Sequence, residues 1–479
     1  MLFPTFVFAL FFLVVFSLNW ILARRPLLWK LFMLAASYVF YGWWDWKYLG
    51  LLIAYTLVNY LGALGIATSS RTGWRRLWLV LTIVFDLGLL GYFKYYGFFS
   101  LSLYRACHHI GLPCSLPLLD VVLPIGISFF AFQLMSYVID VYRRDMPATR
   151  NLLDCAVFIA FFPQLVAGPI VRASQLLPQV AHYAARGPLD PGRAVCLILG
   201  GLFKKTVIAN TLAVALVDPV FANPAGYGAA DVLLAVYGYA FQIYCDFSAY
   251  SDIAIGVGLL LGLELPLNFN APYLAVSLQD FWQRWHISLS TWLRDYLYVP
   301  LGGSRRGERR TYVNLFLTFL LGGLWHGANW TFLFWGLLHG AYRSLERALE
   351  AGLRRLIPDR SPIYTVPWLN RLRRLLLGLW IFHFVCLTWF FFRAETFADV
   401  WTLLGQFRFW TKPQAPVMML AVIAAGFATQ FLDGWRLRPL WDRVARWHPV
   451  WQGLAAAAVL TVILSLGPQG VAPFIYFQF

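Results

Sequence analysis

Long apolar runs separated by short polar and basic clusters make up most of the chain. Several of the runs reach about 20 residues, the length that an α-helix needs to cross a lipid bilayer. We predict crossings at residues 2–22, 31–46, 48–67, 77–96, 118–139, 375–392, 416–432 and 452–466, with one more within 194–222 and one within 232–263. The pattern predicts an all-α polytopic membrane protein with about ten crossings, in which residues 1–479 form a single integral-membrane domain.

The basic clusters predict which side of the membrane each loop faces, because cytoplasmic loops are enriched in Lys and Arg. Arg24 and Arg25 follow the first run, and the clusters at 71–76 and 143–150 each come two predicted crossings later. This alternation places the N-terminus outside the cytoplasm. Continuing the count places the C-terminus outside as well, on the periplasmic side of a bacterial inner membrane.

Residues 156–172 (AVFIAFFPQLVAGPIVR) form an apolar run that is too short and too interrupted to be an ordinary crossing. Pro163 and Pro169 break any regular helix within it. Basic residues flank the run on both sides, so both of its ends should be cytoplasmic. We therefore predict a re-entrant element, whose broken backbone must be satisfied by protein or by a wet cavity.

A second re-entrant element is predicted over residues 311–342, which contain no Asp, Glu, Lys or Arg. Basic clusters again lie on both sides, and the segment is too short for two full crossings. Two half-spans of about 15 residues fit, each reaching roughly 22 Å. The apex then falls at Gly322–Asn329, where Gly322, Gly323 and Gly327 allow the break. His326 lies almost at its centre, deep in the membrane.

A second histidine, His286, lies in an amphipathic segment at residues 278–300. Helical spacing gathers the Leu, Trp and Tyr side chains of this segment into one arc and its charged residues on the opposite side. We expect one helix lying along the cytoplasmic interface and ending at Pro300. His286 falls at the edge of the apolar arc, so it should face protein.

Both histidines have a structural interpretation as well as a functional one. A lone histidine on an apolar helix face is commonly a core residue that is hydrogen-bonded to its surroundings. Ionisable groups at membrane depth are costly and usually functional, which favours function for His326. For His286, position alone favours neither interpretation decisively. We interpret His339 and His383 as structural residues on span surfaces.

Composition agrees with the membrane interpretation. Hydrophobic residues make up 60% of the chain and charged residues 13%, against roughly 45–50% and about 25% in soluble proteins. The net charge of +16 is spread over many short clusters instead of one patch, which argues against a nucleic-acid-binding protein. The first apolar run lacks a basic n-region and a small-residue cleavage site, so we expect a retained span.

Four segments carry a resemblance to a known family. They read FFPQLVAGPIVR (161–172), YCDFSAYSDIAIGVGLLLG (244–262), FWQRWHISLSTWLRDYLYVPLGG (281–303) and LLGGLWHGANWTFLFWGLLHG (320–340). In this order they resemble the membrane-bound O-acyltransferase (MBOAT) family, in its bacterial branch that contains the membrane protein of alginate O-acetylation. The resemblance implies a helical ring around a central funnel, with a catalytic core at about 118–342. It also implies that His326 is the main catalytic residue and that His286 is the second conserved polar position.

The resemblance further implies what the chain does. Bacterial members of the family move acyl groups across the membrane to decorate exported polymers. The implied activity is O-acetylation of an alginate-like exported polysaccharide, with peptidoglycan or cellulose as alternative acceptors. The donor would be acetyl-coenzyme A or another acyl thioester, and the partner a periplasmic SGNH-type acetyltransferase. No bound cofactor and no metal are expected, and the six cysteines show no zinc-type spacing.

The chemistry of O-acyl transfer suits these histidines. A hydroxyl needs a base within hydrogen-bond reach, and an imidazole with a pKa near 6.5 can serve. We interpret His326 as this base and His286 as the residue that orients the thioester or holds a hydroxyl. The sequence contains no Gly-x-Ser-x-Gly motif, which argues against a serine nucleophile.

Tyr476, in the C-terminal PFIYFQF, is a further candidate. In related acyl-export systems a similar terminal tyrosine is implicated as an acyl acceptor, so Tyr476 is a candidate acyl relay at the outer mouth of the funnel. The alternative is an interfacial aromatic anchor.

Several other polar residues are candidates with two interpretations each. Trp325, Asn329 and the helical row Tyr244, Ser248 and Asp252 are candidate funnel-lining residues. For the helical row we favour hydrogen bonds to neighbouring spans. Lys204 and Lys205 either attract a phosphate-bearing donor or, as we favour, reach toward lipid headgroups. Cys107 and Cys114 are placed to form a disulfide in an oxidising compartment.

Two rival functions remain at this point. A transporter without chemistry would predict inverted repeats and intramembrane carboxylates, and the sequence shows no repeat. A long-chain lipid or protein acyltransferase would differ in the acyl-coenzyme A that it consumes.

Overall fold

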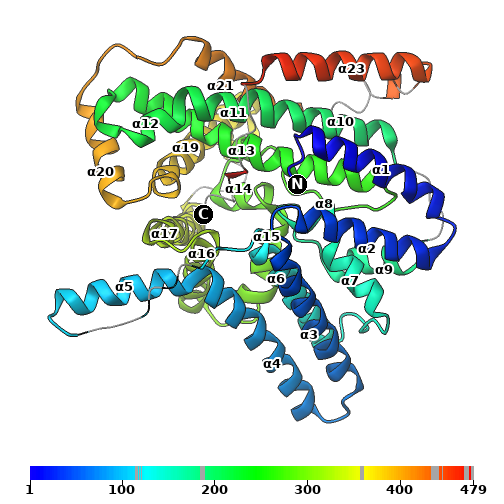
Figure 1. Ribbon diagram of the computed structural model, residues 1–479. Helices are drawn as coiled ribbons and strands as arrows, with labels where there is room; N and C mark the ends of the chain where they lie inside the picture. The colour runs from blue at the N-terminus through cyan, green and yellow to red at the C-terminus, as the bar shows by residue number, and fades with distance from the viewer. Residues whose placement is uncertain are drawn as a thin grey trace. The chain divides into compact units, whose positions relative to one another are not determined.

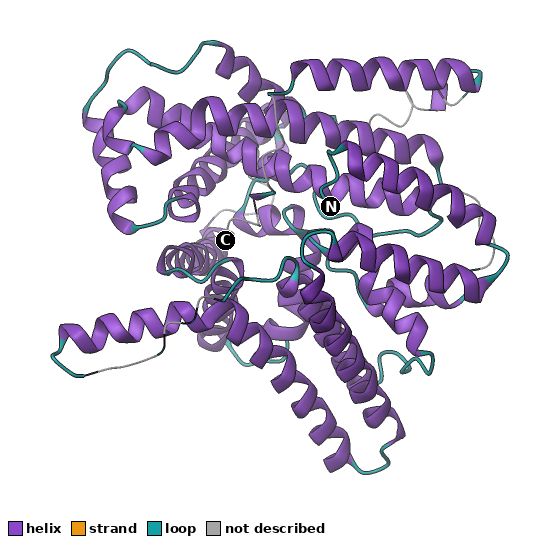
Figure 2. Ribbon diagram, in the orientation of Figure 1, coloured by secondary structure: helices purple, strands orange, loops and turns teal. Residues whose placement is uncertain are grey.

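The computed structural model describes residues 1–113, 117, 119, 121–183, 189–356, 361–432, 442–444, 446–468 and 474–475. Within these ranges all regular secondary structure is helical (Figures 1 and 2), as the all-α prediction requires. The chain divides into two compact units. One comprises Met1–Val195 with Ile253–Pro266, and the other comprises Cys196–Asp252 with Leu267–Phe479.

The first unit is built from helices of the N-terminal third of the chain. They are α1 (Phe6–Leu22), α2 (Pro26–Gly42), α3 (Leu49–Thr68), α4 (Thr72–Leu90), α5 (Tyr96–His109), α6 (Ile127–Arg143), α7 (Leu152–Ala160), α8 (Phe162–Leu165) and α9 (Ala173–Ala181). The side chain of Thr5 caps α1, and Pro26 begins α2, both favourable at a helix start. A buried Lys30–Asp154 ion pair, 2.5 Å long, joins α2 to α7.

Two boundaries in this unit differ from prediction. The run predicted to end at residue 96 continues as helix to His109, through a π-helical turn at Gly91–Tyr95. The helix predicted over 118–139 begins only at Ile127. Pro124 and the left-handed Gly126, with φ of 79°, precede it and prevent an earlier start.

The interrupted segment at 156–172 is broken and enclosed by protein, as predicted. The helix α7 ends at Ala160, and the short α8 has Pro163 in its first turn. Polar side chains satisfy the freed backbone groups. Gln164 Nε2 donates to the Phe158 carbonyl (2.7 Å), and the Phe162 N–H donates to Ser37 Oγ (3.2 Å). That this element enters and leaves the membrane on one side stays a prediction.

The second unit carries the remaining helices. They are α10 (Pro191–Leu202), α11 (Asn210–Leu212), α12 (Asp218–Ala222), α13 (Ala229–Leu260), α14 (Leu278–Arg284), α15 (Ile287–Leu293), α16 (Glu308–His326), α17 (Trp330–Leu356), α18 (Pro362–Thr365), α19 (Pro367–Arg393), α20 (Phe397–Gly405), α21 (Met418–Ala428) and α23 (Pro449–Leu466). Residues at the start of α10 and at the end of α13 fall in the first unit. Two π-helical stretches, Phe203–Ala209 and Ala213–Val217, continue α10 through α11 to α12.

Among the described residues, five helices are long and apolar enough to cross a membrane: Trp46–Thr68, Thr72–His109, Pro191–Ala222, Ala229–Leu260 and Pro367–Arg393. Other predicted crossings fall on shorter helices, including α1, α21 and α23. In the most apolar stretch of α13, 89% of the residues are buried, against 17–44% in the other four candidates. This helix is therefore enclosed by protein along most of its length, and the chain is a multi-pass membrane protein.

The helices α16 and α17 form the hairpin predicted over residues 311–342, and they lie side by side (Figure 1). The turn is at Gly327–Asn329, inside the predicted apex. The prediction that Gly322 and Gly323 break the helix is wrong, since both lie within α16. Gly323 instead permits close packing: a methyl group there would lie 2.3 Å from the Phe332 carbonyl oxygen of α17.

Candidate functional site

His286 lies at a break between two short helices, where we had predicted one continuous helix. The chain leaves α14 in an extended conformation at Trp285, and His286 then adopts the left-handed conformation, with φ of 43° and ψ of 55°. That conformation costs a non-glycine residue about 1–3 kcal/mol. Backbone hydrogen bonds from Asn270 N–H to the Arg284 carbonyl and from Ile287 N–H to the Asn268 carbonyl, each 2.9 Å, hold both sides of the break.

The imidazole of His286 is fully buried, and polar groups of two residues, Asn268 and Ser288, contact it. Its Nδ1 lies 3.2 Å from Asn268 Oδ1 and 3.5 Å from Ser288 Oγ. The Ser288 backbone N–H donates to the same Asn268 oxygen (3.2 Å), so this atom is an acceptor. Asn268 Nδ2 in turn donates to Ser251 Oγ on α13 (3.1 Å).

These contacts assign the protonation of the ring. Because Asn268 Oδ1 accepts, Nδ1 of His286 carries the hydrogen, and Nε2 is the acceptor nitrogen of the neutral imidazole. The break lies outside the five candidate spans, and burial lowers the pKa of His286 to about 3. His286 is therefore neutral near pH 7, and it faces protein as predicted.

His326 is the last residue of α16 and is 3% exposed. Its ring packs against Trp335 of α17 at 5.1 Å between centroids, and against Phe392 of α19 at 5.3 Å, both edge to face. Gly327 follows it, and a methyl group there would lie 2.2 Å from the Phe332 ring. The hairpin therefore places His326 at its turn, where aromatic side chains of α17 and α19 pack against the imidazole.

Trp325 joins the two histidines. Its ring centroid lies 5.2 Å from that of His326 and 5.9 Å from that of His286. It is 3% exposed, so both imidazoles neighbour the same buried ring. The structure therefore brings His286 together with Trp325 and His326, which follow it by 39 and 40 positions in the sequence.

The row Tyr244, Ser248 and Asp252 does share one face of α13, and it faces Lys204. The Lys204 ammonium donates to Ser248 Oγ (2.8 Å) and to Asp252 Oδ2 (2.6 Å), and it lies 5.6 Å from the centre of the Tyr244 ring. The interpretation that we favoured for the lysines, reaching toward lipid headgroups, is wrong in this structure because both side chains are buried, and attraction of a phosphate-bearing donor stays a prediction. Lys204 pairs with Asp252 and Lys205 with Asp246 (2.8 Å), within the protein.

The predicted roles of Asn329, Tyr476 and Cys114 stay predictions, although the structure shows the contacts of Asn329. Asn329 Nδ2 donates to the Glu395 carbonyl (2.9 Å), and its Oδ1 accepts from the Thr331 N–H at the start of α17 (3.2 Å). These bonds fix the hairpin turn, and a funnel-lining role for Asn329 stays a prediction. Tyr476 and Cys114 lie outside the described residues, so the acyl relay and the disulfide also stay predictions.

His339 is not on a span surface, since it is completely buried. Trp282 Nε1 donates to its Nδ1 (3.3 Å), and its Nε2 contacts Thr388 Oγ1 (3.0 Å). Both ring nitrogens are engaged by side chains, which fits the structural interpretation. His383 is half-exposed, and its Nε2 lies 2.8 Å from the Tyr237 hydroxyl.

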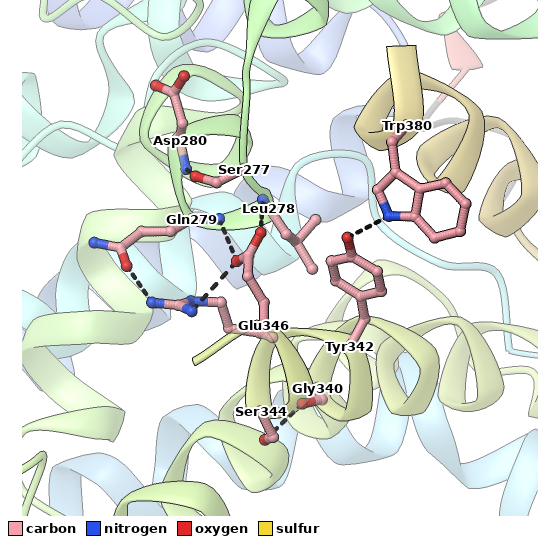
Figure 3. A network of polar contacts seen from close by, with 10 residues as sticks. Ser277, Leu278, Gln279, Asp280, Gly340, Tyr342, Ser344, Glu346 and Trp380 are labelled. Carbon is pink, nitrogen blue, oxygen red and sulfur yellow. Dashed lines mark hydrogen bonds and ion pairs between the residues drawn. The ribbon is translucent and has the colours of Figure 1, made fainter. Parts of the chain in front are cut away.

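A polar network ties α17 to the start of α14 (Figure 3). The Glu346 carboxylate accepts from the backbone N–H groups of Leu278 (2.6 Å) and Gln279 (3.3 Å). Arg343 contacts the same carboxylate at 3.3 Å and also the Gln279 side chain. No sequence pattern predicts this network. It connects the helix that follows His326 with the helix that precedes His286.

Asn268, Ser251 and Ser288 were also missed. Asn268 follows a Pro-Leu pair in a segment without helical periodicity, so no sequence pattern indicates that it lies near His286. In the part of the chain that the structure describes, no cluster of three or more His, Cys, Asp or Glu side chains could hold a metal ion. The polar groups gathered near Trp325 are two buried imidazoles, a carboxamide and hydroxyls.

Comparison with known proteins adds independent information. The sequence model of the membrane-bound O-acyltransferase family matches residues 41–390. The chain is 40% identical to a probable alginate O-acetylase AlgI of Pseudomonas putida, over 94% of each chain. It is 43% identical to the Azotobacter vinelandii protein of that name, over 85% of this chain and 80% of the relative. A Helicobacter pylori peptidoglycan O-acetyltransferase is 39% identical, over 82% of this chain and 76% of the relative.

Proposed function

The chain belongs to the membrane-bound O-acyltransferase family, and from that premise we propose that it O-acetylates an exported, alginate-like polysaccharide. Its relatives support an O-acetyltransferase activity, and the alginate O-acetylases among them support the acceptor. Peptidoglycan is the alternative acceptor, because the Helicobacter pylori relative is named for it. In this proposal the enzyme lies in a bacterial inner membrane, with both termini on the periplasmic side.

One observation carries the chemical part of the proposal: two buried imidazoles flank Trp325, one at a hairpin turn and one at a helix break. In the proposed reaction the acceptor hydroxyl gives its proton to His326, while its oxygen bonds to the thioester carbonyl carbon. The carbon–sulfur bond then breaks, and the departing thiolate takes up the proton. General base catalysis of this kind contributes about 10²–10⁴ in rate.

His286 has a different proposed role. Asn268 fixes its Nδ1–H, so the Nε2 lone pair has a set direction within the site. An acceptor atom of fixed direction can hold a hydroxyl or orient the donor, as the sequence analysis suggested for this residue. The αL backbone and the Asn268 carboxamide together support this positioning role.

The donor and the partner complete the proposal. We propose a cytoplasmic acyl thioester as donor, acetyl-coenzyme A or another thioester. A periplasmic SGNH-type acetyltransferase would deliver the group to the polymer, and Tyr476 would carry the acetyl group between the two. The family implies an acyl donor, and the described end of the tail, Phe474–Ile475, lies in the same compact unit as both histidines.

The test is the O-acetyl content of exported polysaccharides, measured by NMR in cells that carry the wild type or His326→Ala. We expect the esters of one polymer to disappear in the variant, and the identity of that polymer names the acceptor. The matched control is His383→Ala, which removes a half-exposed imidazole that contacts Tyr237 and should leave the esters unchanged.

Unchanged esters on every polymer in a folded His326→Ala protein would overturn the proposal. That outcome would direct attention to the transporter alternative, which requires no base. A long-chain acyltransferase would be identified by the acyl-coenzyme A that the purified protein consumes.

A further inference from the structure

Two described residues near the C-terminus, Phe474 and Ile475, contact α13 and are buried there. Phe474 and Ile475 are each 2% exposed. The backbone N–H of Ile475 donates to Asp246 Oδ2 on α13 over 2.9 Å, across 229 positions of sequence. A tail that served only as a surface anchor at the membrane interface would have no need of a buried backbone contact with a carboxylate.

The acceptor of this bond is itself held in place. Asp246 Oδ1 forms an ion pair with Lys205 Nζ at 2.8 Å, and the two side chains are 5% and 9% exposed. A buried carboxylate needs a charged partner, because removal from water is costly. Lys205 pairs with one oxygen of the Asp246 carboxylate, and the other oxygen accepts from the Ile475 N–H. Hydrogen bonds to ionised acceptors are also stronger than neutral ones.

The tail also contacts the aromatic layer beside His286. The Phe474 ring lies 5.6 Å from that of Phe247 and 5.0 Å from that of Tyr250. Phe247 in turn presents its edge to His286 at 4.6 Å. One aromatic ring therefore lies between the docked tail and the imidazole, and all these residues belong to one compact unit.

We propose that the Lys205–Asp246 pair is a latch that docks the C-terminal tail beside His286, and that both residues are positioning residues for acyl transfer. The docking itself stands apart from the proposed function, and only its effect on acyl transfer rests on that function. In this arrangement Asp246 Oδ2 accepts from the tail backbone, and Lys205 pairs with the other oxygen of the carboxylate.

The docking is tested by photo-crosslinking in the full-length protein in membranes. A p-benzoylphenylalanine at position 474 should crosslink to the α13 peptide that contains Phe247 and Tyr250. Ile475→Pro removes the donated N–H and should reduce the crosslink yield about tenfold, the equivalent of about 1.4 kcal/mol for a hydrogen bond to a charged group. Ile475→Ala keeps the N–H and should retain most of the yield.

A charge exchange separates the latch from a simple packing role. The double variant Lys205→Asp with Asp246→Lys restores an ion pair between the two helical segments but leaves no acceptor for the Ile475 N–H. We expect a folded protein with a low crosslink yield. Asp252→Asn is the matched control, because it breaks the neighbouring Lys204 ion pair, and it should leave the crosslink unchanged.

A full crosslink yield in both Ile475→Pro and the exchanged pair would overturn the latch. The effect on transfer is read from polymer esters: the exchanged pair and Ile475→Pro should each lower them, and their combination should lower them no further. Normal esters in both variants would refute the positioning role while leaving the crosslinks as proof of docking. Failure of the proposed function would be seen separately, as normal esters in His326→Ala with an intact crosslink.

Discussion

The two histidines at Trp325 are held in place in different ways. His286 has a strained backbone that hydrogen bonds to the 268–270 segment maintain, and its ring is fixed by a carboxamide. His326 is the last residue of an ordinary helix, and its side chain packs against aromatic rings of α17 and α19. The His286 imidazole is thus positioned mainly through the main chain, and the His326 imidazole through side-chain packing. Substitutions should therefore affect the two residues unequally.

The largest expected effect is on catalysis at His326. His326→Ala should reduce acetyl transfer by about 10²–10⁴, with a modest loss of stability, because the backbone there is helical. Transfer to an acceptor and the melting temperature of the purified protein measure the two quantities. A variant that loses melting temperature in proportion to its activity would contradict the separation of the two roles.

The next effect concerns the hairpin that carries His326. Gly323→Ala places a methyl group 2.3 Å from the Phe332 carbonyl oxygen and should destabilise the protein by about 1–3 kcal/mol. Thermal or denaturant unfolding in detergent would measure the loss.

Gly352→Ala is the matched control, since a methyl group on Gly352 of α17 meets no atom within 4 Å. It should be neutral or slightly stabilising, because alanine favours a helix. Equal stability losses in the two variants would show that the close approach at Gly323 is unimportant.

At His286 the backbone itself should respond to substitution. His286→Ala puts a residue with low αL preference at φ of 43°, whereas asparagine visits this region more readily. We expect His286→Ala to be about 1–2 kcal/mol less stable than His286→Asn. Both should lose activity, so the stability difference is the informative quantity. Equal stabilities would mean that the break relaxes when the imidazole is removed.

The last prediction is a pH dependence of stability. Burial lowers the pKa of His286 to about 3 in the folded protein, from 6.5. Below pH 6.5 the unfolded chain therefore binds a proton that the folded chain does not, and stability falls as pH falls toward 3. The contribution of this residue is up to about 1.4 kcal/mol per pH unit.

His286→Asn should flatten the melting temperature between pH 6.5 and pH 4.5 relative to the wild type. Identical slopes in the two proteins would show that His286 titrates in the folded state.

Sequence periodicity predicted the parts of the fold that depend on local pattern. The α16–α17 hairpin followed from an uncharged run between basic clusters, and its turn at Gly327–Asn329 lies within the predicted apex. The buried break at 161 followed from Pro163. In each case the residues that predict the feature lie within the element itself.

Features that depend on tertiary contacts were missed. The 278–300 segment has an uninterrupted amphipathic pattern, and the break at His286 is stabilised by residues 268–270, which precede that pattern. The lysine pairs with α13 were missed for the same reason, because a carboxylate more than 40 positions away satisfies each ammonium. Helical spacing showed which face of α13 is polar, but it could not show what lies opposite.

The close approach of α16 and α17 also limits the route of the substrate. Gly323 and Gly336 bring the two backbones so near that a methyl group on either would collide with a carbonyl oxygen of the other helix. No acyl chain can pass between the helices at these two positions. If His326 acts as we propose, its substrates must therefore approach the imidazole from a direction other than this helix contact.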